Sequence, residues 1–389
     1  MSKAFLSGNE AFAEGVRLAK PQVISAYPIT PQTIVVERLS EMVEDGSLKS
    51  EFVHVESEHS ALSAAMGASS IGARAFTATS SQGLLYMAEC LPYASGGRFP
   101  IVMMNANRST ALPWNIYGDQ RDSISQLDCG WLQVYVENAQ ESLDMAIQSF
   151  LIAEDKRVLT PIMVNLDGFV LTHTYEAVDI PNQDVVDKFL PKFETENKMD
   201  LENPKNLAFS VGPADNMEFK YQQHKAVIDS KSVINEVDAK FGEVFGRKYS
   251  GLVEAYKCED ADYILLTLGS ITGLCREVVD TLRESGNKVG VLKLRFLRPF
   301  PDKEIIDIVK NAKAIGVLEK DISFGYEGTV YTNVNSALLK GGLHMKSYNF
   351  VGGLGGRDIT IDNISEIFSH MKNGGEFVNF IGLGVDINE

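Results

Sequence analysis

Two glutamates at the start of a small-residue segment are the carboxylates best placed for chemistry. Glu56 and Glu58 occupy a polar turn directly after the apolar run 52–55, which has the length and branching of a strand. Ligands of parallel sheets bind where strands end, so a carboxylate in this turn could accept a proton or a hydrogen bond from a ligand. The alternative is two acids in the first turn of a helix, where the helix dipole favours negative charge.

A hydroxyl stands at a second strand end. The run 23–27 predicts a strand that stops at Pro28, and Thr30 follows just ahead of Pro31 and a predicted helix over residues 32–44. Thr30 could cap that helix, or it could direct its hydroxyl toward a ligand. Position alone leaves both interpretations open.

Arg108 is the cation with the most suggestive position. It follows a buried-looking strand over residues 100–105 and precedes a long irregular segment, to about Cys129, that contains Trp114. Long loops that follow strands commonly carry function. A guanidinium there could hold both oxygens of a ligand carboxylate. The alternative is a structural ion pair with one of three nearby acids, Asp119, Asp122 or Asp128.

Strand-like and helix-like patterns alternate along the chain and predict an α/β protein. Residues 51–91 read as strand, helix, strand, helix, which is the unit of a parallel sheet. We expect a doubly wound parallel-sheet domain over residues 1–256, including a Pro-rich and polar linker excursion at about 180–255. The regular block 257–389 predicts a smaller second α/β domain. The Gly-rich run 352–357 lacks the spacing and context of a dinucleotide-binding motif and predicts a tight turn.

Composition narrows the class of protein. The 389 residues carry a net charge of −16 without a Lys/Arg-rich run, which argues against nucleic acid and anionic membrane surfaces as partners. No stretch approaches 18 continuous apolar residues and the first twenty residues lack a signal-peptide core, so we expect a cytoplasmic protein without a membrane span. The four cysteines are dispersed, which argues against a metal or iron–sulfur site in this chain.

Motifs along nearly the whole chain, in the same order as in the family, carry a family resemblance. The sequence resembles the α subunit of the pyruvate:ferredoxin oxidoreductases, within the 2-oxoacid:ferredoxin oxidoreductase superfamily. The motifs are YPITPQT, VESEHSALSAAMGAS, FTATSSQGLLYMAE, PWNIYGDQRDSISQLDCGW, MVNLDGFVLTHTYE, LRFLRPFP, LEKDISFGYEG and GLGGRD.

The resemblance implies a thiamine-diphosphate-binding-type domain, which faces the aminopyrimidine ring, and a transketolase C-terminal-like domain. It implies an enzyme that decarboxylates pyruvate oxidatively, forms acetyl-CoA from coenzyme A and reduces ferredoxin, reversibly. It further implies a β subunit that shares thiamine diphosphate and binds Mg²⁺, and γ and δ subunits, or fused equivalents, that bring the coenzyme A domain and 4Fe–4S clusters.

The resemblance also implies roles for four residues. Glu58 falls where the family places the carboxylate that hydrogen-bonds N1′ of the aminopyrimidine, a contact that promotes removal of the thiazolium proton. Thr30 falls where a hydroxyl meets cofactor and substrate, and Arg108 falls where the 2-oxoacid carboxylate binds. Ile116 falls where the pocket meets the methyl end of the substrate.

Two other functions stay open at this point. A 2-oxoisovalerate:ferredoxin oxidoreductase α subunit would share most of these motifs, and PWNIYGDQ has features of both substrate pockets. From another class, the chain could be a non-catalytic interaction subunit with a degenerate thiamine fold. The joint presence of Glu58, Thr30 and Arg108 argues against that second alternative.

Overall fold

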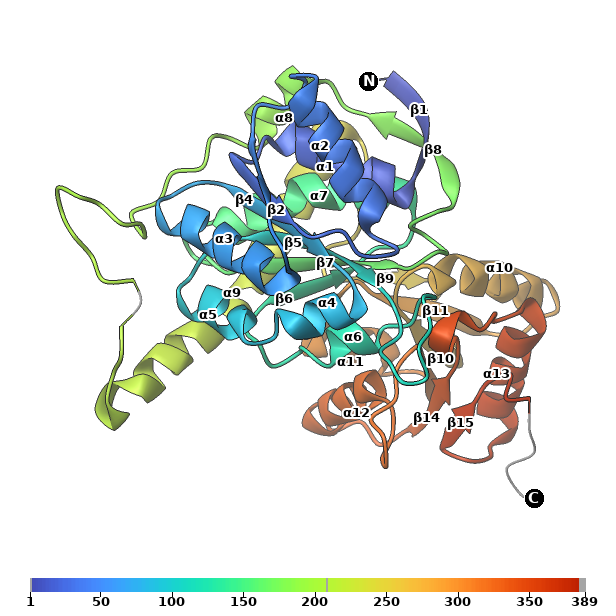
Figure 1. Ribbon diagram of the computed structural model, residues 1–389. Helices are drawn as coiled ribbons and strands as arrows, with labels where there is room; N and C mark the ends of the chain where they lie inside the picture. The colour runs from blue at the N-terminus through green and yellow to red at the C-terminus, as the bar shows by residue number, and fades with distance from the viewer. Residues whose placement is uncertain (1, 208, 385–389) are drawn as a thin grey trace.

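A seven-stranded sheet forms the centre of the N-terminal half in the computed structural model, which describes residues 2–207 and 209–384 (Figure 1). Its strand order is β12-β6-β7-β5-β4-β2-β3, and every neighbouring pair is parallel except β12 with β6. The strands are β2 (Val23–Ala26), β3 (Glu51–His54), β4 (Ala75–Thr79), β5 (Val102–Asn107), β6 (Leu132–Tyr135), β7 (Ile162–Asp167) and β12 (Phe296–Arg298). The expected doubly wound parallel sheet is confirmed.

Helices cover both faces of this sheet. Along β4 and β5, alternate side chains enter different cores: Phe76 and Met104 face one, and Ala75 and Met103 face the other. Burial on both faces explains why these strands read as continuous apolar runs. The helices are α1 (Gly8–Ala19), α2 (Thr33–Glu44), α7 (Ala139–Glu154) and α8 (Gln183–Phe189) on the first face, α3 (Glu58–Ser70), α4 (Ser81–Tyr86) and α5 (Cys90–Gly96) on the second, and the short α6 (Arg121–Ile124) near the end of β5.

The C-terminal half is built on a six-stranded sheet with the order β15-β14-β13-β10-β11-β9, in which only β9 is antiparallel to its neighbour. Helices α10 and α13 pack on one face, and α11 and α12 on the other. The elements are β9 (Val253–Tyr256), β10 (Tyr263–Thr267), α10 (Ile271–Glu284), β11 (Val289–Leu294), α11 (Asp302–Val309), β13 (Ala314–Glu319), α12 (Thr329–Lys340), β14 (Lys346–Val351), η1 (Leu354–Gly356), α13 (Ile361–Asn373) and β15 (Val378–Phe380).

Strand pairing crosses the expected domain boundary at 256 in both directions. Strand β9 lies before the boundary but pairs with β11 of the C-terminal sheet, whereas β12 lies after it but pairs with β6 of the N-terminal sheet. Both are short edge strands whose partners are distant in the sequence, so their local pattern does not reveal the sheet to which they belong. The two halves therefore exchange edge strands.

The excursion at about 180–255 contains more regular structure than expected. Helix α9 (Pro213–Phe245) occupies much of it, and the C-terminal half of this helix buries Val233, Val237 and Phe241 in the main core. Its N-terminal half projects from the body (Figure 1). At the other end of the domain, β1 (Ser2–Ser7) pairs with β8 (Tyr175–Ile180) in a two-stranded antiparallel sheet.

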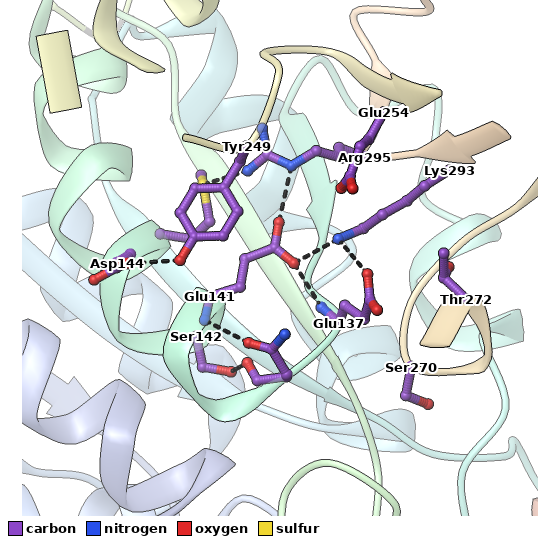
Figure 2. A network of polar contacts seen from close by, with 12 residues as sticks. Glu137, Glu141, Ser142, Asp144, Tyr249, Glu254, Ser270, Thr272, Lys293 and Arg295 are labelled. Atoms are coloured by element: carbon purple, nitrogen blue, oxygen red, sulfur yellow. Dashed lines mark hydrogen bonds and ion pairs between the residues drawn. The ribbon is translucent and has the colours of Figure 1, made fainter. Parts of the chain in front are cut away.

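A buried ionic network joins the two halves (Figure 2). Glu141 of α7 accepts hydrogen bonds from Lys293 Nζ at 2.6 Å and Arg295 Nε at 2.8 Å, and Lys293 also pairs with Glu137 at 2.9 Å. Burial raises the pKa of Glu141, but the two cations oppose this effect and hold it at about 2. The charges are thus fully paired, which is the condition under which buried ions are tolerated.

Candidate active site

Glu58 is the first residue of α3, at the carboxyl edge of the N-terminal sheet. Ser57 caps the helix by accepting the backbone N–H of Ser60 at 3.2 Å, and this fixes where the helix begins. The Glu58 side chain is almost buried, with 8% of its surface exposed. It packs on Gly83, where an added Cβ would lie 2.7 Å from Glu58 Oε1. Glycine at this position therefore leaves room for the carboxylate.

The Glu58 carboxylate makes no hydrogen bond with any residue in the described part of the chain, although buried carboxylates are normally paired. The Thr79 hydroxyl, which lies against the same Gly83 position, and the hydroxyl of the adjacent Ser80 are also buried without a hydrogen-bond partner among the described residues. A nearly buried acceptor with open lone pairs fits the protonated or imino-type ring nitrogen of an aminopyrimidine. These residues therefore fit the aminopyrimidine ring of thiamine diphosphate that the resemblance leads us to expect.

Thr30 and Arg108 meet at the same edge of the sheet. Arg108 Nη1 donates a hydrogen bond to the backbone oxygen of Thr30 at 2.8 Å. Thr30 itself is exposed, and the N-cap position of α2 belongs to Gln32, which forms no side-chain cap. The capping interpretation of Thr30 is therefore wrong, and its hydroxyl stays available.

Arg108 is 5% exposed, and its Nε has no hydrogen-bond partner among the described residues. The indole of Trp114 lies against the guanidinium, with 5.6 Å between Cζ and the ring centroid. Burial lowers the pKa of Arg108, and the Asp122 carboxylate opposes this shift. None of the ion pairs among described residues involves this side chain: Asp119 pairs with Arg121 at 2.8 Å, and Asp122 hydrogen-bonds to Arg108 through its backbone N–H and not through its guanidinium. The guanidinium thus keeps donors for a ligand.

Ile116 lies half-buried on the loop that follows Arg108. This loop is held from the C-terminal half: Asn115 Nδ2 donates to the Gly355 oxygen at 2.8 Å, and the Gly355 N–H donates to Asp119 Oδ2 at 3.0 Å. Gly355 has φ +61°, a conformation that favours glycine. The Gly-rich run is therefore the tight turn that was expected, and it supports the loop next to the site.

The structure thus brings Thr30 and Arg108 into contact and places Glu58 and the Ile116 loop at the same sheet edge. Sequence reasoning missed Gly83 and Trp114. A glycine after SSQ at a strand end was a usable signal for the first, and the aromatic content of the loop was a weaker signal for the second. Within residues 2–207 and 209–384, no three His, Cys, Asp or Glu side chains gather as a metal site, and no helix is long and apolar enough to cross a membrane.

Comparison with known families assigns this geometry to a class. Residues 14–239 match the family described as pyruvate flavodoxin/ferredoxin oxidoreductase, thiamine diphosphate-binding, and residues 261–364 match pyruvate:ferredoxin oxidoreductase core domain II. The fold and the site define a subunit of a thiamine-diphosphate-binding oxidoreductase. The chain belongs to the pyruvate:ferredoxin oxidoreductase family.

Similar proteins cover nearly the whole chain. Pyruvate synthase subunit PorA of Methanothermobacter thermautotrophicus is 50% identical over 97% of both chains. Ketoisovalerate oxidoreductase subunit VorA of Pyrococcus abyssi is 44% identical over 95% of this chain and 93% of its own. A chain in a solved structure of 2-oxoglutarate:ferredoxin oxidoreductase from Magnetococcus marinus has a similar fold, with a TM-score of 0.73 and 21% sequence identity. The matched region covers 95% of the present chain and 65% of the Magnetococcus chain. This last likeness shows the fold.

Proposed function

We propose that this chain is the catalytic α subunit of a pyruvate:ferredoxin oxidoreductase. The reaction converts pyruvate and coenzyme A into acetyl-CoA and CO₂ while ferredoxin is reduced, and it is reversible. The observation that carries the proposal is the buried Arg108 guanidinium, which lies at the ligand edge of the sheet and has no carboxylate partner among the residues that the structure describes. The 50% identity to a pyruvate synthase subunit supports the choice of substrate.

Each candidate residue has a role in this reaction. Glu58 would accept a hydrogen bond from N1′ of the aminopyrimidine and thereby favour the form of the ring that can remove the thiazolium proton. Thiamine diphosphate, when bound, supplies the nucleophilic carbon and the electron sink for decarboxylation. Arg108 holds the carboxylate of the 2-oxoacid until CO₂ leaves, the Thr30 hydroxyl contacts cofactor and substrate, and Ile116 limits the space at the methyl end.

The other parts of the reaction belong to partner subunits. A β subunit binds the diphosphate and Mg²⁺, and γ and δ subunits, or fused equivalents, contribute coenzyme A binding and 4Fe–4S clusters that pass electrons to ferredoxin. The dispersed cysteines of this chain are consistent with that division, since all four are free thiols. We expect the isolated chain to bind thiamine diphosphate weakly, because one carboxylate contact contributes only about 1.5–3 kcal/mol.

The alternative substrate is 2-oxoisovalerate, because the VorA relative is nearly as similar as the PorA relatives. A substrate panel on the reconstituted complex separates the two. We expect kcat/KM for pyruvate to exceed that for 2-oxoisovalerate. The reverse order would transfer the assignment to a branched-chain enzyme, and a Glu58→Ala complex with full activity would support a non-catalytic subunit.

A further inference from the structure

We propose that Asp122 is a positioning residue that ties the Arg108 strand end to the turn on which Glu58 packs. The inference rests on the proposed function, since it assigns a further residue to the same site. Asp122 lies in the short helix α6 and is fully buried. It has no place in the chemistry derived above, yet it contacts both sides of the site.

The carboxylate connects two strand ends directly. Asp122 Oδ2 accepts the backbone N–H of Ser81, just beyond β4, at 3.0 Å and the backbone N–H of Arg108, just beyond β5, at 3.1 Å. A single oxygen atom therefore sets the separation of these two backbone segments. An acceptor with one hydrogen-bonding site could not satisfy both N–H groups.

The contact with Ser81 leads on to Glu58. Ser81 has φ +49°, in the left-handed region that side chains other than glycine rarely adopt, so its turn needs support from outside. Two residues later, Gly83 packs against the Glu58 carboxylate. The same turn receives a second connection, because the Ser81 hydroxyl donates to the backbone oxygen of Ser109 at 2.7 Å. The turn under Glu58 is thus held by the segment that follows Arg108.

Three more donors hold Asp122 itself in place. Asn107 Nδ2 and the Ser123 backbone N–H each donate to Oδ1 at 2.7 Å, and Asn105 Nδ2 donates to Oδ2 at 3.2 Å. No cation pairs with Asp122 in the described part of the chain, and burial raises its pKa to about 6. Hydrogen-bond donors alone therefore keep the ionised carboxylate in the interior. This set of contacts fixes the positions of the backbone segments around Asp122 and does not neutralise a neighbouring charge.

The test is Asp122→Asn in the reconstituted complex, assayed with pyruvate. An amide nitrogen at the Oδ2 position would face the N–H donors of Ser81 and Arg108 and push the two strand ends apart. At the Oδ1 position it would face Asn107 Nδ2 and the Ser123 N–H, so the whole side chain, and with it the oxygen that joins the strand ends, must move. A misplacement of about 1 Å in a reacting group lowers rates roughly 10²-fold. We expect kcat/KM for pyruvate to fall by about 10², with KM raised at least tenfold, and the affinity for thiamine diphosphate to change less than threefold.

Glu154→Gln is the matched control. Glu154 is a nearly buried carboxylate of the same domain, and it pairs with Arg74 at 2.6 Å near the opposite edge of the sheet. This control should lower the melting temperature and leave KM within twofold. If Asp122→Asn behaved in the same way, with a lowered melting temperature and an unchanged KM, Asp122 would be structural and the proposal wrong.

A second variant covers failure of Asp122→Asn to fold. Asn107→Ser keeps the carboxylate and removes the Nδ2 donor, and it should raise KM about three- to tenfold; an unchanged KM there would also overturn the proposal. If the wild-type complex used 2-oxoisovalerate and not pyruvate, the proposed function would be wrong, whereas the proposal for Asp122 would still stand to be tested. The Asp122 experiment would then be run with that acid, because both substrates present the same carboxylate to Arg108.

Discussion

Arg108 Nη1 donates to the backbone oxygen of Thr30 at 2.8 Å, which joins two residues that are 78 positions apart. This one bond orients the guanidinium and leaves its other donors free, because the described acids nearby are engaged elsewhere. The bond also fixes the backbone of the turn whose hydroxyl is proposed to meet the substrate. The proposed carboxylate site and the proposed cofactor contact are thereby held in one unit.

Arg108→Lys should raise the KM for pyruvate roughly 10- to 150-fold, because loss of one charge-assisted contact costs about 1.5–3 kcal/mol. Lysine offers a point charge without the planar fork. We expect a smaller fall in kcat, since the carboxylate is held in the ground state as well. Steady-state kinetics of the complex checks this. A normal KM with a lowered melting temperature would make Arg108 a structural residue.

Glu58→Gln should lower turnover about 10²–10⁴-fold, the usual range for removal of an acid–base group. The amide can accept a hydrogen bond but does not stabilise a protonated ring nitrogen. Glu56→Gln is the control, because Glu56 is exposed and bonds only to the Ser60 hydroxyl at 2.5 Å among described residues. Equal activities of the two variants would refute the assignment of Glu58.

Trp114→Ala should raise the KM for pyruvate about 2- to 5-fold, the equivalent of a cation–π contact of about 0.5–1 kcal/mol. The Trp114 ring faces the Arg108 guanidinium although the side chain is largely exposed. Trp114→Phe retains an aromatic face and should lie between the wild type and the alanine variant. A KM that is the same in all three proteins would show that the stacking does not affect binding.

Glu319 should make stability depend on pH. Burial raises its pKa from 4.5 to about 8, although the backbone N–H groups of Val330 and Tyr331 and the Asn349 amide favour the charged form. A carboxyl whose folded pKa is raised contributes stability that is present below its unfolded pKa and lost as pH rises through its folded pKa. This pKa shift corresponds to a decrease in the free energy of unfolding on the order of 5 kcal/mol between pH 4.5 and 8.

Glu319→Gln removes that titration. Denaturant unfolding at pH 5 and pH 9 should therefore show that the wild type loses stability relative to the variant as the pH rises. If the difference in free energy of unfolding between the wild type and the variant were the same at pH 5 and pH 9, the raised pKa of Glu319 would be contradicted.

Lys293→Met should destabilise the protein by about 3–5 kcal/mol, because it removes the buried partner of one oxygen of Glu137 and one oxygen of Glu141 (Figure 2). Glu137 keeps its pair with Arg276, and Glu141 keeps its pair with Arg295. Lys313→Met is the control, since Lys313 pairs with Asp262 on the surface and should contribute little. Unfolding of the two variants in urea measures the difference. Similar stabilities would show that the network between the two halves is not needed for folding.

The sequence by itself determined where the candidate functional side chains stand along the chain. Apolar runs followed by polar turns placed Thr30, Glu58 and Arg108 at the ends of β2, β3 and β5, and parallel strands bring such ends to one edge. The periodicity of residues 51–91 was sufficient because the contacts that define strand and helix there are local. The motif order also identified the family, which the comparisons confirm.

Only the tertiary structure decided which groups are paired and which are free. Three acids in the sequence could have neutralised Arg108, and only the fold shows that Asp119 is taken by Arg121 while Asp122 binds backbone N–H groups. Likewise, the exchange of β9 and β12 between the sheets and the burial of Glu58 against Gly83 depend on partners far away in the chain. Pairing between distant residues leaves no local periodicity, so it is decided by the packing of the whole chain.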